Sequence, residues 1–411
     1  MDHIRGEKAD LFAVLSEEEE NRDWIVFEGG KEMAERRERN SGIELLRILA
    51  AMGVIILHYN NAEIGGGLKY AAGYHQLMLQ LLQNTAICAV NVFVLISGYF
   101  LSRSGRRDCT KPLELIFQVI LYGELSLLLQ AGMGWEKLSL RHIAGLLLPC
   151  NWFILIYSGL YLISPYLNVL LSGLREKDRA EGSWRQRRKL LILLLLLFSF
   201  YPSAVDLLQN LAGKDYNGLS TISFYGSQHG YTIVNFALLY LIGAFLRDYE
   251  EEGKDRREAG KEEASQGGLL LLFLGNLLLL LLWACFERWR GIPVRESTAW
   301  SYCNPLVISE AVLVFRLFKG LKLPTVSAIN CLAQAAFSAY LLHPVFLPHL
   351  RIREAAALPL PLLLFHVLSC AATLYLLAFF MQLIFSFCTG PVFRALRKKL
   401  GERRFLDLES G

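Results

Sequence analysis

Long apolar runs recur along most of the chain, and polar stretches separate them. A bilayer crossing takes about 20 residues of helix, and runs of about that length fill the region between residues 43 and 387. We place about ten of them, at residues 43–60, 85–102, 112–131, 151–171, 189–205, 231–247, 267–286, 299–318, 328–347 and 361–387. The pattern predicts an all-α integral membrane protein with about ten transmembrane helices.

Composition and charge support a membrane protein and predict its orientation. Hydrophobic residues make up 54% of the chain and charged residues 19%, with a mean hydropathy of +0.35, which is more apolar than one soluble core requires. The loops alternate in charge, and one set carries about twice as many Lys and Arg residues as the other. The positive-inside rule then places both termini in the cytoplasm. The net charge of +4 reflects topology, so we expect membrane lipid and no nucleic acid as a partner.

Polar segments flank the membrane region. The first forty residues are mixed in charge, and Met33 directly precedes the basic stretch AERRERN. We hypothesise that residues 1–32 are an overextended start, which mass spectrometry of the native N-terminus would test. The stretch EEEGKDRREAGKEEASQGG is predicted to be a solvated cytoplasmic loop. The expected parts are a cytosolic extension, a membrane domain and a basic cytosolic tail, at 1–40, 41–390 and 391–411.

Several familiar chemistries have no motif in the sequence. The eight cysteines are spread singly, without a CxxC pair or a Cys/His ligand spacing, so we predict neither a disulfide framework nor a metal site. The sequence also lacks GxxxxGK[ST], GxGxxG and GxSxG, which argues against the common nucleotide-binding and serine hydrolase folds. We therefore expect no bound cofactor.

The first span, GIELLRILAAMGVIILHYNN, is unusual because it contains Glu44, Arg47 and His58. A charge at membrane depth costs about 2.5 to 3.5 kcal/mol on insertion scales, so such residues suggest function. Arg47 and His58 are eleven positions apart, which puts them on one helix face about 16 Å from each other. Glu44 can pair with Arg47 three positions later. The alternative is that Glu44 and Arg47 snorkel to the interface and His58 caps the outer end.

Four stretches in this order resemble the family-3 integral-membrane acyltransferases, which O-acylate bacterial surface polysaccharides and related acceptors. The first is the Arg, ten residues, His arrangement of the first span, and the others are NVFVLISGYFLS, NWFILIYSGLYLISPYLN and FSAYLLHP. The resemblance covers residues 40–390. It implies that Arg47 and His58 are required for activity, that the chain lies in the bacterial plasma membrane, and that the donor is a cytosolic acyl-CoA, usually acetyl-CoA. The acceptor would be a hydroxyl near the opposite face.

The sequence departs from the family pattern before the third span. A tighter Arg and Pro cluster is expected there, whereas this chain has RSGRRDCTKP, with Arg106, Arg107 and Lys111 at looser spacing. These three residues are the candidates for contacts to the donor phosphates.

The chemistry of acyl transfer favours the same two residues of the first span. The acceptor hydroxyl must lose its proton as it attacks the thioester, and a His side chain, with an ordinary pKa of about 6.5, suits that task near neutral pH. We therefore assign the general base to His58. A guanidinium binds phosphate or carbonyl oxygens, and the distance to His58 favours a donor-positioning role for Arg47.

Other polar or aromatic side chains in the spans are weaker candidates for the donor or acceptor site: Asn91, Ser97, Trp152, Tyr157, Glu310 and His343. His343 could serve the acceptor site or be an interfacial histidine. Glu310 or Glu124 could orient His58 through a hydrogen bond or form contacts between helices. Trp152 and Tyr157 also suit an aromatic interface belt.

We predict a membrane O-acetyltransferase that modifies a lipid-linked or exported glycan. Two other classes stay open from the residues alone. A multi-pass transporter would also bury Arg, His and Glu, although the sequence has no inverted halves. A noncatalytic module that presents a partner would tolerate replacement of His58. The sequence leaves the oligomeric state open, and also whether transfer is direct or passes through an acyl-enzyme.

Overall fold

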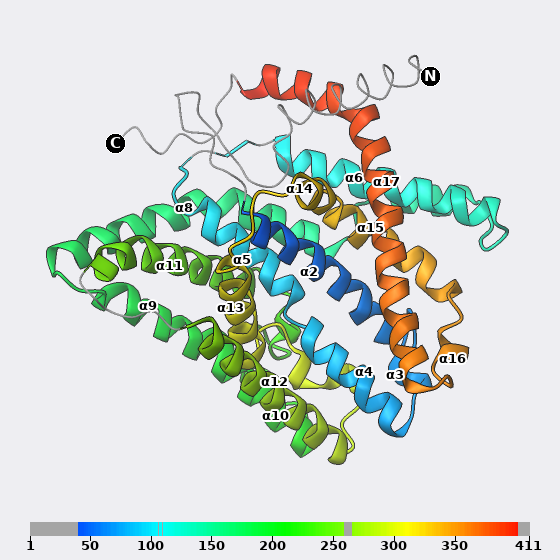
Figure 1. The fold of residues 1–411 in the computed structure, drawn as a ribbon, viewed down its shortest axis with the longest axis horizontal. Coiled ribbons are helices and arrows are strands. Elements are labelled where there is room, and N and C mark those ends of the chain that lie inside the picture. Colours follow the sequence, from blue (N-terminus) through cyan, green and yellow to red (C-terminus); the bar gives the residue numbers. More distant parts are fainter. Residues whose placement is uncertain (1–39, 106, 109, 259–264, 402–411) are drawn as a thin grey trace.

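The computed structural model describes residues 40–401, apart from 106, 109 and 259–264, and this part of the chain consists of helices and connecting turns without a β-strand. Eight of the helices are long and apolar enough to cross a membrane, and a bent helix pair makes a ninth candidate. The prediction of an all-α, multi-pass membrane protein is confirmed (Figure 1). The count of ten, the cytoplasmic termini and the three-part division of the chain stay predictions, and the start at Met33 lies outside the described residues.

Helix α2 (Ser41–Asn60) runs through the middle of the bundle. The Asn40 side chain accepts a hydrogen bond from the Ile43 backbone N–H at 3.1 Å and so caps its first turn. The remaining helices surround it, with these bounds: α3 Gly67–Tyr70, α4 Gly73–Ala86, α5 Ala89–Leu101, α6 Thr110–Gly132, α7 Leu140–Leu146, α8 Trp152–Ala180, α9 Arg185–Leu195, a π-helical turn Leu196–Phe200, α10 Tyr201–Ala212, α11 Ile233–Glu258, α12 Gln266–Trp289, α13 Pro305–Lys319, α14 Ser327–Ala333, α15 Ala336–Phe346, α16 Ile352–Ala355 and α17 Leu360–Gly401.

Two apolar clusters form the core, and α2 belongs to both. Leu46 and Val54 pack in the cluster that α5, α8, α11 and α13 complete. Ile48 and Ile55 pack in the other cluster, with α15 and α17. Because α2 is enclosed on both sides, Glu44, Arg47 and Asn60 are buried inside the protein, while His58 is half-buried.

Some spans begin earlier or end later than the sequence predicted. Helices α4 and α5 together form one span, Gly73–Leu101, whereas hydropathy placed its start at residue 85. The discrepancy arises because α4 carries polar residues such as Gln80 and Asn84, which lower its hydropathy but are buried in the bundle. The predicted solvated loop is also partly wrong, because α11 continues through residue 258.

Buried ion pairs hold the far ends of α8, α9 and α11 together. Asp248 is completely buried and accepts contacts from Arg103, Arg175 and Arg187, at 2.9, 2.9 and 3.1 Å. Arg187 also binds Asp178 at 2.6 Å. Mutual pairing offsets the desolvation cost of these charges. Basic residues that the sequence assigned to two separate cytoplasmic loops therefore meet at one end of the bundle.

Candidate active site

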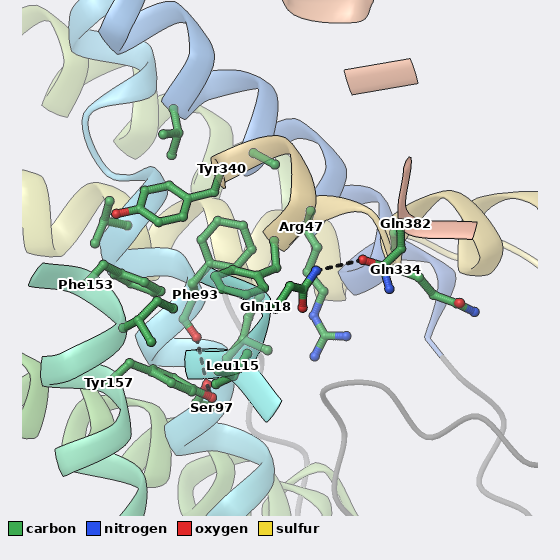
Figure 2. Close-up of a pocket in the computed structure, with 18 of the residues that line it drawn as sticks. Arg47, Phe93, Ser97, Leu115, Gln118, Phe153, Tyr157, Gln334, Tyr340 and Gln382 are labelled. Atoms are coloured by element: carbon green, nitrogen blue, oxygen red, sulfur yellow. Dashed lines mark hydrogen bonds between the residues drawn. The ribbon is translucent and has the colours of Figure 1, made fainter. Parts of the chain in front are cut away.

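A pocket opens between α2, α5, α6, α8, α15 and α17 (Figure 2). Aromatic rings gather on one side of the view, where Phe153, Tyr157 and Tyr340 lie, and polar side chains, among them Gln334 and Gln382, lie on the other. The complete lining is Glu44, Arg47, Ala51, Val54, Val90, Phe93, Ile96, Ser97, Lys111, Glu114, Leu115, Gln118, Phe153, Ile154, Tyr157, Ala333, Gln334, Ala336, Phe337, Tyr340 and Gln382.

One face of α2 forms a wall of this pocket. Arg47, Ala51 and Val54 line it at helical spacing, and His58 is the next residue on the same face. The Arg47 guanidinium lies 3.1 Å from the Glu44 carboxylate, and both residues are buried, with exposed fractions of 6% and 5%. The predicted pair is confirmed. The snorkelling alternative is wrong, because the pair faces the protein interior.

His58 lies against His343 of α15, with ring centroids 4.5 Å apart. Nδ1 of His58 lies 2.9 Å from the Val54 carbonyl oxygen, and Nδ1 of His343 lies 2.9 Å from that of Ala339. A carbonyl oxygen only accepts, so Nδ1 is the donor in both contacts, and the neutral form of each ring has its lone pair on Nε2. Nε2 of His343 is buried without a hydrogen-bond partner among the described residues.

The pocket and the histidine pair adjoin each other. Neither histidine is among the lining residues, but Val54 and Tyr340 are, and these residues lie one helical turn before His58 and His343 respectively. The pocket therefore leads along α2 from Arg47 toward the two imidazoles. The alternative of an interfacial His343 is wrong, since only 1% of this residue is exposed.

A family model for an acyltransferase domain matches residues 40–389 of this chain. The chain belongs to the family-3 acyltransferases. The match covers every residue that lines the pocket, and it supports a membrane acyltransferase in place of the transporter or the noncatalytic module that the residues alone left open. No curated protein and no solved structure matches the chain significantly.

Buried amides and hydroxyls form a polar wall beside the acyltransferase pocket, and Gln118 and Gln382 of this group line it. The Gln118 side chain of α6 donates hydrogen bonds to Ser338 of α15 and to Gln382 of α17, each at 3.0 Å (Figure 2 draws the second). Tyr122 and Ser338 share a further hydrogen bond of 2.9 Å. The sequence analysis missed this group. Its signal was present, because Gln118 and Gln382 are isolated amides in otherwise apolar runs.

Arg107 and Lys111, the described residues of the basic cluster at the start of α6, lie in different surroundings. Lys111 lines the pocket. Arg107 instead donates to Ser164 at 2.7 Å and to the Ser104 carbonyl at 2.9 Å, so it ties the start of α6 to α8 and is not part of the lining. Arg106 lies outside the described residues. Of the described residues of this cluster, Lys111 is the one that lines the pocket, and a contact to the donor stays a prediction.

Two of the candidates from α5 and α8 contact each other at the pocket. The hydroxyls of Ser97 and Tyr157 lie 3.0 Å apart, and both residues line the cavity. Tyr157 is buried, so its assignment to an interface belt is wrong. Trp152 packs on Tyr302 at the start of α8, outside the lining. Asn91 donates to the Tyr302 carbonyl at 2.8 Å, a contact between structural elements.

The membrane carboxylates do not orient His58 as the sequence suggested. Glu310 is fully buried, and neither of its oxygens has a hydrogen-bond partner in the described part of the chain. Oε1 of Glu124 is likewise buried without a hydrogen-bond partner among these residues. The backbone carbonyl of Val54 orients the His58 ring instead. The described residues also contain no cluster of three or more metal-ligating side chains.

Proposed function

We propose that this membrane acyltransferase moves an acyl group, most simply acetyl, from cytosolic acyl-CoA to a hydroxyl of a lipid-linked or cell-surface glycan, with His58 as the general base. The observation that supports this proposal is the continuous face of α2, along which the pocket leads from Arg47 to Val54, next to His58. A long donor can lie along this face with its charged end and its reactive end far apart.

The pocket has the chemistry that a CoA thioester requires along its length. Arg47 and Lys111 supply positive charge at one end for the phosphates. Gln118 and Gln382 offer amide groups that can exchange hydrogen bonds with the two amides of the pantetheine arm. Apolar walls cover the remainder and exclude water from the thioester.

The contact of Nδ1 with the Val54 carbonyl supports the tautomer of neutral His58 that a base needs. With hydrogen on Nδ1, its Nε2 lone pair accepts the proton of the acceptor hydroxyl while the hydroxyl oxygen attacks the thioester carbonyl carbon. The tetrahedral intermediate then collapses as the C–S bond breaks, and the His58 imidazolium returns the proton to the departing CoA sulfur. The products are the glycan ester and free CoA.

We assign His343 to the acceptor side of the reaction. Its Nε2 is buried, carries a lone pair and lies beside the His58 ring. A second hydroxyl of a sugar can donate to this nitrogen, which would orient the reacting hydroxyl toward His58. In this role His343 positions the acceptor, while His58 takes the proton.

The experiment that tests the proposal measures glycan-bound O-acetyl in cells that lack the native gene. Cells are complemented with wild type, Arg47→Ala, His58→Ala or the control His142→Ala, which alters an exposed histidine outside the pocket. Membrane levels of all proteins are matched. We expect the ester to be restored by wild type and by the control and to be absent with the other two. Restoration by His58→Ala would overturn the proposed base.

A further inference from the structure

A row of aromatic rings continues from the pocket to the surface of the bundle. Phe153 and Tyr340 line the pocket (Figure 2), and their ring centroids lie 5.4 Å apart. Trp152, the first residue of α8, contacts Phe153 at 5.8 Å and Tyr231 at 4.5 Å. Tyr231 is 46% exposed. An exposed ring is therefore joined through successive aromatic contacts to rings that line the pocket.

The same row reaches the two histidines at its other end. Tyr340 packs on His343, with ring centroids 6.2 Å apart, and His343 contacts His58 at 4.5 Å. Among the described residues, no ring contact joins Trp152 or Tyr231 directly to either histidine. A ligand unit that rests on Trp152 and Tyr231 would therefore be a different unit from the one that reacts at His58.

Trp152, Tyr231 and Tyr302 form the exposed end of this row, and we name these three residues the aromatic platform. The Trp152 and Tyr302 rings are nearly parallel, at an interplanar angle of 21°, and Tyr231 stands at 89° to the first and 79° to the second. Tyr302 is buried, whereas Trp152 is half-buried. Such edge-to-face contacts fix the orientation of aromatic rings. The platform is therefore a preformed aromatic surface.

The segment before Tyr231 adopts a strained backbone conformation. Gln228 and His229 have φ angles of 54° and 49°, in the left-handed region that residues other than glycine rarely adopt. Two contacts hold His229 there: its carbonyl accepts from the Tyr302 N–H at 2.9 Å, and its Nδ1 lies 3.0 Å from the Ser301 hydroxyl. Backbone strain of this kind persists where surrounding contacts impose it, and it clusters at ligand sites. Here it fixes the chain directly before the exposed ring of the platform.

The chemistry of the aromatic platform suits a sugar ring. Its three side chains carry no charge. The C–H groups on one face of a pyranose are apolar and pack on the electron-rich face of an aromatic ring, while the hydroxyls around the rim of the sugar stay free for hydrogen bonds.

We propose that the aromatic platform is a sugar-binding subsite, on which one ring of the glycan acceptor stacks while a neighbouring sugar unit presents its hydroxyl to His58. This inference rests on the proposed function, since it names a second contact for the same acceptor. The platform contributes to acceptor affinity and takes no part in donor binding or in the proton transfer.

The test is steady-state transfer by the purified full-length protein from labelled acetyl-CoA to surface glycan isolated from cells that lack the native gene. Tyr231→Leu removes the flat ring but keeps an apolar side chain, and we expect it to raise the acceptor KM about tenfold. The kcat and the KM for acetyl-CoA should change less than about twofold. Tyr231→Phe retains the ring and should recover most of the loss. The control Tyr225→Leu, which alters a 72% exposed tyrosine outside the platform, should behave like wild type.

The leucine and phenylalanine variants separate stacking from other roles of Tyr231. A ring that only anchors the protein in the lipid interface would leave the acceptor KM unchanged in Tyr231→Leu, and this result would overturn the inference. Equal increases of the acceptor KM in Tyr231→Leu and Tyr231→Phe would overturn it too, because the hydroxyl and not the ring would then be required. A fall in kcat without a change in acceptor KM would also contradict it. Absence of transfer to the glycan by wild type would instead refute the proposed function, and the inference with it.

Discussion

The two ends of α2 bury polar groups in opposite ways. Near the start of the helix, Arg47 and Glu44 satisfy each other as an ion pair at 3.1 Å. Near the end, Nδ1 of His58 and Nδ1 of His343 each form a hydrogen bond with a backbone carbonyl. Nε2 of His343 has no hydrogen-bond partner among the described residues. A paired charge is suited to hold a substrate, whereas a neutral imidazole with an open lone pair is suited to take a proton. The comparison assigns binding to one end and chemistry to the other.

The largest expected effect comes from the chemical end. His58→Gln should lower kcat by about 10² to 10⁴, the usual contribution of a general base, while acetyl-CoA affinity stays at the wild-type value. Turnover and calorimetry on the same preparation measure both quantities. If donor affinity fell together with kcat, the division between the two ends would be incorrect.

The binding end should respond through stability as well as affinity. Arg47→Gln leaves Glu44 buried without its cation, which typically costs about 3 to 5 kcal/mol. In Glu44→Gln/Arg47→Gln most of this stability should return, because no charge is left unpaired, but acetyl-CoA affinity should not. Thermal unfolding in detergent and calorimetry separate the two. Recovery of both in the double variant would make the pair structural only.

His343 sharpens the comparison within the chemical end. His343→Gln should lower kcat about tenfold and raise the acceptor KM, a smaller effect than that of His58→Gln, because the substituted residue positions the acceptor and does not take its proton. Steady-state kinetics with varied acceptor provide the measurement. A loss as large as that of His58→Gln would assign the proton transfer to both rings.

The polar wall between the two ends should give the smallest effect. Gln118→Leu removes the donor to Ser338 and Gln382 and should destabilise the protein by about 1 to 3 kcal/mol, with a few-fold weaker binding of acetyl-CoA. S-acetylpantetheine, which retains the amides of the donor arm, should be weakened equally. An effect confined to acetyl-CoA would place Gln118 beside the phosphates instead.

The sequence predicted what depends on local pattern. Hydropathy identified an all-α, multi-pass membrane protein, and the eleven-residue spacing put Arg47 and His58 on one helix face, which is the face along which the pocket leads to His58. The pairing of Glu44 with Arg47 also follows from local spacing. These features require no knowledge of how distant helices pack.

Contacts between distant segments could not be predicted. His58 contacts His343, although the two residues lie near opposite ends of the membrane-domain sequence. Gln118 and Gln382 are also far apart in the sequence and form a hydrogen bond. A single sequence contains no signal for either partner. Burial likewise reversed the interpretation of Tyr157, since an aromatic residue near a helix start suits an interface and a pocket wall equally. The sequence predicted a basic cytosolic tail from residue 391 onward, and the apolar pattern gave no sign that α17 continues as a helix through Gly401.

The central claim is that the acyl group of the donor reaches His58. The direct measurement is the site at which S-bromoacetyl-CoA, which carries an alkylating carbon where the acyl group would be, modifies the purified protein. Mass spectrometry of the digested protein should find the label on His58, and excess CoA should prevent it. A label found elsewhere in the chain, with His58 unmodified, would contradict this account of the site.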